Sequence, residues 1–192
     1  MIKTKKEGGL GFRDIHGFNM AMLCKQAWRL LNKPNSLCAK VLRAMYYNGQ
    51  SCLDVVPRPG MSYTWRSILK GFDLLKQGLI WRVGDGEGLN IWSDPWIPRN
   101  MSRKPITPKG GNLISKVNEL IHPITGMWDS QLVQDTFWWE DARLILAILV
   151  HEGLANRAAW HFDRKGIFSV KSAYKVFRTN QVNGSCRGGV NL

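Results

Sequence analysis

Three acidic residues lie close together in one stretch of the chain. Carboxylates at such short spacing can hold a metal ion. A loop over residues 84–88 contains Asp85 and Glu87, and Asp94 follows shortly after it. A nuclease could use such a set to bind Mg²⁺. Turns, however, commonly carry carboxylates that are simply solvated. We therefore expect neither a metal ion nor a catalytic residue at this position.

The glycines of the same loop resemble a phosphate-binding turn only superficially. A dinucleotide-binding loop needs a third glycine where Leu89 stands, and a helix behind it, whereas a strand-like run follows here. A calcium-binding EF-hand loop fails as well. Counted from Asp85, its sixth position is Asn90 instead of Gly, and its twelfth is Trp96 instead of Glu. The sequence therefore predicts no cofactor.

The remaining residues with chemical potential also lack the spacing of an active site. No Ser or Cys stands in a nucleophile-elbow pattern. Glu140 and Asp141 suit a helix start, where negative charge meets the positive end of the helix dipole. Four histidines have no ligand-like spacing: His16, His122, His151 and His161. We predict that the chain is not an enzyme.

The cysteines indicate a reducing environment. Cys24, Cys38, Cys52 and Cys186 form no Cys-x-x-Cys pair, so neither a disulfide framework nor a zinc site is expected. Cys24 and Cys38 fall in helical patterns and are predicted to be buried free thiols. No signal peptide or membrane-spanning run is evident. We expect an intracellular location, in the nucleus or cytoplasm, with an organelle as the alternative.

The charge favours a polyanionic partner. The formal net charge is +13, from 27 Lys and Arg against 14 Asp and Glu, and such an excess favours RNA or DNA through release of condensed counterions. The candidate phosphate contacts are Lys3, Lys5, Lys6, Arg13, Arg99, Arg103, Lys104 and Lys109. Among nine Trp residues, the candidates for stacking on bases are Trp81, Trp92 and Trp96. The alternative for these three is burial in the core. No membrane partner is expected, and the oligomeric state is open.

Hydrophobic spacing predicts a helix-dominated α+β fold with two short β-hairpins. The expected hairpins cover residues 79–92, where three glycines separate two Trp-containing runs, and 158–170. Trp28, Trp65 and Trp160 are expected in the core. Helices are predicted over 19–31, 36–47, 62–77, 113–121, 130–137, 141–150 and 171–178.

Composition divides the chain into five parts. We predict a basic arm over residues 1–15, a helical subdomain with the Trp hairpin over 16–96, and a basic Pro/Gly-rich linker over 97–112. Helices and the second hairpin fill 113–178. The polar, Gly-rich segment 179–192 is expected to be a disordered tail.

The order of short motifs resembles one protein family over about residues 5–178. The segments that carry the resemblance are 6–14, 18–19, 25–30, 65–68, 84–86, 94–98 and 166–174. At these intervals they are similar to the C-terminal connector of plant LINE-type (non-LTR) retrotransposon reverse transcriptases. The resemblance implies a place after the polymerase domain and before a Cys/His zinc-binding region, beyond which a ribonuclease H domain sometimes lies.

The sequence also departs from that family. It has no adjacent Asp pair and no Tyr-x-Asp-Asp, the carboxylates that would hold the metal ions of nucleotidyl transfer, and it lacks the Cys/His zinc cluster. Family members often carry Asp where Asn156 stands. We predict a non-catalytic fragment of a reverse transcriptase-like polyprotein that binds RNA or DNA weakly and without sequence preference. The alternatives are a domesticated or inert structural or protein-interaction module and, third, a ribonuclease H-type nuclease with converging carboxylates.

Overall fold

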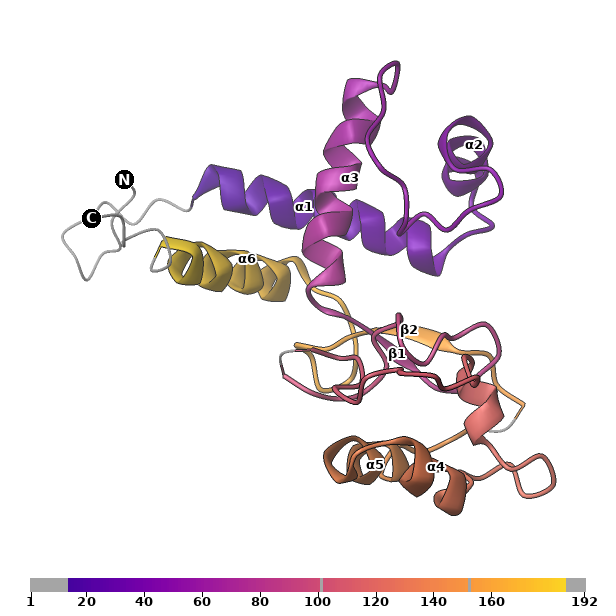
Figure 1. The fold of residues 1–192 in the computed structure, drawn as a ribbon. Helices are drawn as coiled ribbons and strands as arrows, with labels where there is room; N and C mark the ends of the chain where they lie inside the picture. The colour runs from indigo at the N-terminus through magenta and orange to yellow at the C-terminus, as the bar shows by residue number, and fades with distance from the viewer. Residues whose placement is uncertain (1–13, 101, 152, 186–192) are drawn as a thin grey trace. The chain divides into compact units, whose positions relative to one another are not determined.

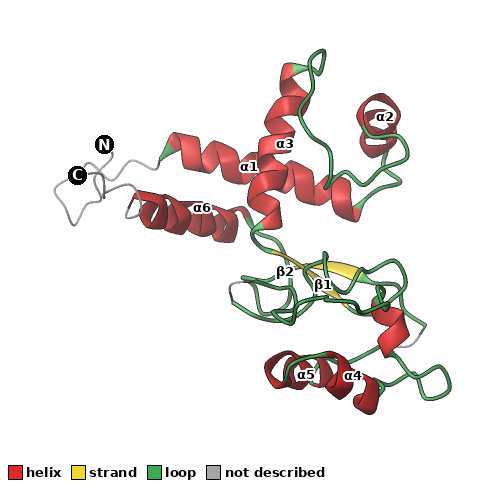
Figure 2. Cartoon of the chain, in the orientation of Figure 1, coloured by secondary structure: helices red, strands yellow, loops and turns green. Residues whose placement is uncertain are grey.

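The computed structural model describes residues 14–100, 102–151 and 153–185, and it confirms a helix-dominated α+β fold. Two compact units form: residues 1–78 with 162–192 make the first, and 79–161 make the second. The first unit contains α1 (Ile15–Asn32), α2 (Leu37–Tyr46), α3 (Tyr63–Lys76) and α6 (Val170–Ser185). The second contains β1 (Leu79–Arg82), the 3-10 helix η2 (Val117–Leu120), α4 (Ser130–Thr136), α5 (Trp139–Leu146) and β2 (Arg157–Trp160) (Figures 1 and 2).

Helix α1 buries a stripe of small residues. Gly17, Ala21, Cys24 and Ala27 lie three or four positions apart and are all buried, as is Leu30 one turn further on. The larger Met20, Leu23 and Leu31, which recur at helical spacing in the sequence, are only half-buried. Small side chains let neighbouring backbones approach, so α1 packs closely against both α3 and α6.

Helix α3 crosses α1 at Gly71. A Cβ built on Gly71 would lie 2.5 Å from the carbonyl carbon and oxygen of Leu23, so the two backbones touch here. Ser62, where the predicted helix begins, is its N-cap, since its Oγ accepts a hydrogen bond from Trp65 N–H. Trp65 is fully buried, as predicted, and stacks on Tyr47. The helix therefore fixes the core of the first unit.

Helix α2 exposes the apolar residues that spacing placed inside. Ser36 caps it as predicted, by accepting from Ala39 N–H. Leu37, Val41 and Met45, however, are 79%, 48% and 64% exposed, and only Ala39 of the helix is buried. The burial predicted for these three side chains is therefore wrong, because α2 packs through Ala39 and through Tyr46, which stacks on Trp65.

Helix α6 extends beyond its predicted end. It continues from residue 178 to Ser185, so residues 179–185 of the predicted disordered tail are helical, and residues 186–192 lie outside the described part. Phe168, just before the helix, stacks on Trp28 with ring centroids 5.6 Å apart. Phe177 meets His16 at 5.6 Å. These ring contacts hold α6 against α1.

The two predicted strand regions pair with each other instead of forming two hairpins. β1 and β2 are antiparallel, with Leu79 opposite Trp160 and Arg82 opposite Arg157. Residues 89–91 do not return along β1, because Asn90 bridges Lys116 instead. In the second predicted hairpin, over residues 158–170, Gly166 has a positive φ, but the chain then enters α6 and does not return as a strand. The pairing joins segments some 75 residues apart, for which local turn signals carry no information.

The predicted linker over 97–112 is part of the second unit's core. Ile97, Arg103 and Thr107 are buried within it, and Trp96 and Ile97 N–H groups both donate to the Arg103 carbonyl. The surrounding apolar cluster comprises Val83, Leu89, Ile91, Trp96, Ile97, Val117, Leu120, Val133, Phe137, Ala142 and Ile145. Among the described helices, none combines the length and apolar character needed to cross a membrane.

Gly71→Ala tests the α1–α3 crossing. Alanine normally favours a helix over glycine by roughly 1 kcal/mol, but here its methyl group would press on the Leu23 backbone. We expect the free energy of unfolding to fall by about 2 kcal/mol, as for an overpacked core. Urea denaturation would measure this. Gly111→Ala is the control, because a Cβ there meets nothing within 4 Å. A stabilised Gly71→Ala chain would contradict the crossing.

Candidate nucleic-acid interface

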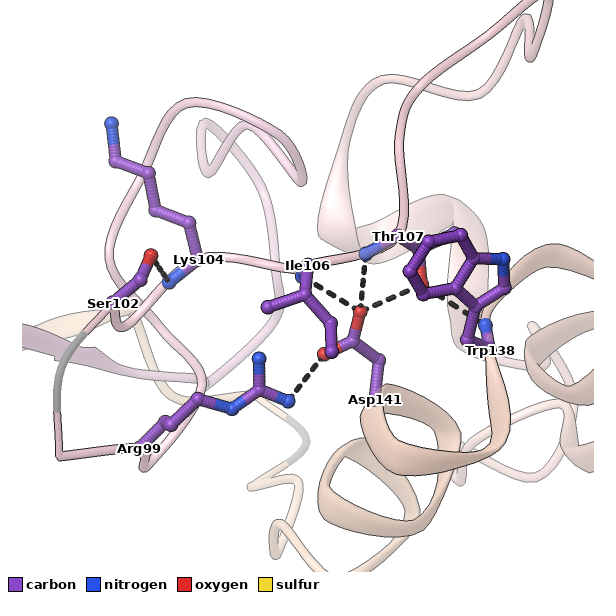
Figure 3. A network of polar contacts seen from close by, with 7 residues as sticks. All are labelled: Arg99, Ser102, Lys104, Ile106, Thr107, Trp138 and Asp141. Atoms are coloured by element: carbon purple, nitrogen blue, oxygen red, sulfur yellow. Dashed lines mark hydrogen bonds and ion pairs between the residues drawn. The ribbon is translucent and has the colours of Figure 1, made fainter.

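The predicted phosphate-contact residues differ in where the structure places them. Lys3, Lys5, Lys6 and Arg13 lie outside the described residues. Lys104 and Lys109 are exposed on the second unit, and Figure 3 shows the Lys104 ammonium directed away from the polar network beside it. Arg99 and Arg103, by contrast, are engaged with protein groups. The structure therefore does not gather the eight predicted residues into one surface.

Arg99 is committed to a buried carboxylate. Its Nη2 donates to Asp141 Oδ1 at 2.6 Å, and the side chains are 21% and 0% exposed respectively. The other oxygen, Oδ2, accepts from Ile106 N–H, Thr107 N–H and Thr107 Oγ1 at 2.7 to 2.8 Å (Figure 3). Asp141 was predicted only as a helix-start residue. It lies in the first turn of α5, as predicted, and it also ties the 99–107 segment to that helix, a contact between distant segments that local sequence does not signal.

Arg103 is a structural residue. It is 7% exposed, and its Nε donates to the carbonyl of Leu79 in β1 at 3.0 Å. Burial lowers its pKa from the usual value, because desolvation disfavours the charged guanidinium. Desolvation, followed by the charge of Arg103, also lowers the pKa of His161. The prediction of a phosphate contact at Arg103 is corrected, since the side chain lies inside the unit.

The three candidate stacking residues belong mainly to the core. Trp96 is 1% exposed and donates its Nε1–H to the Ile91 carbonyl. Trp92 is half-buried against Phe137 and donates to the Ile114 carbonyl. Trp81 is half-buried against the same cluster. The core alternative therefore describes Trp96 and Trp92, and the large exposed aromatics of this unit are Trp138 and Trp139, which spacing did not single out.

The glycine-rich loop is closed by Asn156. Its Oδ1 accepts from the N–H groups of Gly84 and Gly86, while its Nδ2 donates to Asp85 Oδ1 and to the Glu87 carbonyl. An Asp at this position could accept but not donate, and it would face the Asp85 carboxylate. The amide of Asn156 therefore fits the donors and acceptors of this loop. From the family resemblance, Asn156 was only a position where the sequence departs from the Asp that family members often carry.

The carboxylates of this loop do not converge on a cation site. Across residues 14–100, 102–151 and 153–185, no group of three or more His, Cys, Asp or Glu side chains is arranged to hold a metal ion. Asp85 is used by Asn156, and Asp94 accepts from Asn90 N–H at 2.7 Å. Both carboxylates thus shape the local backbone.

The cysteines follow the prediction in part. Cys24 is a buried free thiol, and burial raises its pKa to about 12, which keeps it protonated. Cys38 is free but exposed, because it lies on the uncovered side of α2, so its predicted burial was wrong. Cys52 is half-buried, and desolvation raises its pKa.

Positive charge is divided unequally between the two units. In the described residues, the first unit carries 14 Lys and Arg against four Asp and Glu, whereas the second carries eight against eight. The positive excess of the described part therefore belongs to the helical unit. Lys104 and Lys109 lie on the unit that has no net charge in its described residues.

The helices of the first unit display this charge to solvent. Its exposed basic residues in the described part are Lys25, Arg29, Lys33, Lys40, Arg43, Arg58, Arg66, Lys70, Lys76, Arg164, Lys165, Lys171 and Lys175. Among the described residues, none of these side chains forms an ion pair with an Asp or Glu. Helix formation therefore produces the candidate interface by turning α1, α3 and α6 so that small and apolar residues face inward and basic residues face water.

The fold and its charge define a helix-dominated α+β protein with a strongly basic helical unit. It is similar to the Arabidopsis thaliana protein named "Putative ribonuclease H protein At1g65750", with 34% identity over 196 residues. The match covers 95% of this chain but only 30% of that protein. No protein-family profile and no solved structure matches the chain.

A second relative is covered over most of its own length. It is the Arabidopsis thaliana protein named "Uncharacterized mitochondrial protein AtMg00310", with 39% identity over 109 residues, 56% of this chain and 69% of that protein. The chain belongs to the same family as this protein. Together with the motif order, the two relatives support a retroelement-derived protein.

Asp141→Asn tests the buried carboxylate. The amide would place a donor toward groups that already donate, Arg99 or the Ile106 and Thr107 N–H groups. Breaking a buried ion pair on one side costs about 3 kcal/mol, so we expect a loss of that order in urea denaturation. Asp135→Asn is the matched control. The Asp135 carboxylate is exposed, so this variant should unfold at the same urea concentration as the wild type. Equal stability of the two variants would refute the role of Asp141.

Asn156→Asp tests the loop closure. The new carboxylate keeps the contacts to Gly84 and Gly86 but loses both donations and repels Asp85. We expect a destabilisation of about 1–3 kcal/mol, the cost of leaving polar groups unpaired. Combining it with Asp85→Asn restores a donor–acceptor pair and should recover part of the loss. Additive effects in this double-mutant cycle would show that the two side chains do not interact.

Proposed function

We propose that this chain is a non-catalytic, sequence-independent nucleic-acid-binding region of a retroelement-derived protein, equivalent to the connector of a plant LINE-type reverse transcriptase. The observation that carries the proposal is that the positive excess of the described residues lies on the helical unit, with 14 Lys and Arg against four Asp and Glu. Phosphate contacts of this kind need charge but no base recognition.

The assignment to a connector rests on motif order and on the relatives. The chain corresponds to 30% of the length of a protein named for ribonuclease H, so that protein's activity extends to this chain only as a proposal. A nuclease role would need several carboxylates around a cation, and within the described residues no such group forms. We therefore place binding, and not cleavage, first.

The compartment follows the same proposal. Nucleus and cytoplasm are where RNA and DNA of a retroelement would be met in a reducing environment. An organelle is the alternative, and one relative carries the word mitochondrial in its name. Locating a fluorescent fusion of the chain in plant cells would decide between them.

One observation favours a second function, a protein-interaction module. The exposed Leu37, Val41 and Met45 lie four residues apart on α2 and form an apolar stripe that the described residues leave uncovered. Exposed apolar stripes of this kind mark protein contacts more often than nucleic-acid contacts. Size-exclusion chromatography with light scattering of the full chain would reveal association, which this function requires if the partner is another copy.

A salt titration tests nucleic-acid binding. Fluorescence anisotropy with a labelled 20-nucleotide single strand should give a linear fall of log affinity with log salt, with a slope of about −3 if roughly four phosphates are contacted. The variant Lys104→Gln/Lys109→Gln should keep both affinity and slope, because these residues lie on the near-neutral unit. A slope of zero, or no binding at low salt, would reject the function.

A further inference from the structure

The outer side of α6 forms a groove that combines positive charge, hydroxyl groups and an exposed aromatic ring. The groove has a volume of about 450 Å³ and lies wholly within the first unit. Its lining residues are Phe162, Ser169, Lys171, Ser172, Lys175, Val176, Thr179 and Asn180. None of them was singled out by the sequence as a binding residue.

The basic side of the groove is set by helical spacing. Lys171 and Lys175 are one turn apart on α6, so their ammonium groups emerge on the same face, and both are exposed. They belong to the first two turns of a 16-residue helix, where the positive end of the dipole adds to their charge. A phosphate group entering here meets two cations and no carboxylate among the lining residues.

The hydroxyl side is anchored in the helix start. Ser169 Oγ accepts from Ser172 N–H at 3.2 Å, and Ser172 Oγ donates to the Ser169 carbonyl at 2.8 Å. Thr179 Oγ1 donates to the Lys175 carbonyl at 3.1 Å. These bonds fix the hydroxyl groups in place, and all three residues line the groove. The polar lining is thus held by the helix and does not have to be ordered by a ligand.

The apolar side supplies a surface for a base. Phe162 is 47% exposed, and Val176 beside it in the lining is 8% exposed. A ring that is half uncovered next to two lysines is the combination used by proteins that bind single strands, which stack bases on aromatic side chains while cations follow the phosphates. A duplex hides its base faces, so the ring distinguishes a single strand.

We propose that this α6 groove is a subsite for single-stranded nucleic acid, in which Lys171 and Lys175 pair with phosphates and Phe162 stacks on a base. The proposal rests on the proposed function, because it places that binding at one site of the helical unit. It commits to a single strand, since charge alone would accept a duplex equally well.

The two lysines and the ring give different signatures in the full-length chain. Lys171→Gln/Lys175→Gln should weaken binding of a labelled 20-nucleotide single strand and make the slope of log affinity against log salt shallower by about 1.4. Phe162→Leu should weaken the same binding roughly tenfold and leave the slope unchanged, because stacking releases no counterions. With a duplex of equal length, Phe162→Leu should not weaken binding.

The matched control removes the same charge elsewhere. Lys104→Gln/Lys109→Gln changes the net charge equally but lies outside the groove, so affinity and slope should match the wild type. Circular dichroism melts show whether each variant is folded. Two results would overturn the groove but leave the proposed function standing. One is that both lysine-pair variants lose the same affinity relative to a wild type that binds. The other is that Phe162→Leu binds single strands as the wild type does. Absence of wild-type binding would overturn both.

Discussion

The close approach of α1 and α3 is the constraint on which the basic unit depends. Gly71 brings the α3 backbone against Leu23 and Cys24, and the small residues Gly17 and Ala21 extend the same buried stripe along α1. Because α6 packs on α1 as well, the three helices turn small or apolar residues inward and cations outward. The positive surface is a consequence of how tightly the inner faces fit.

The second unit differs from the first in its charge and in the role of its polar side chains. It is close to neutral, and its conspicuous polar residues are consumed by its own backbone. Asp141 satisfies Arg99 and two N–H groups of the segment 106–107, and Asn156 satisfies four groups of the glycine-rich loop. Segments that are long and irregular need such partners, because a buried backbone group without a hydrogen bond is costly. Polar residues of this unit that resemble catalytic or metal-binding residues therefore stabilise its fold.

The two units therefore differ in charge and in how their polar residues are used. A protein in the same family is covered over 69% of its length, and a protein named for ribonuclease H over 30% of its length, so similar regions occur in proteins of different size. In our proposal the helical unit holds nucleic acid by its phosphates. The α6 groove adds the preference for an unpaired strand.

The sequence by itself determined the helices, their caps and the charge. Ser36 and Ser62 cap the helices that local spacing predicted, Trp65 lies in the core, and the excess of Lys and Arg is a matter of composition. These features depend on neighbours in the chain. Only the tertiary structure decided that β1 pairs with β2, that Arg103 is buried while Lys104 is not, and that Lys171 and Phe162 share a groove. Each of these depends on contacts between distant segments, and local periodicity carries no record of which distant partner a residue meets.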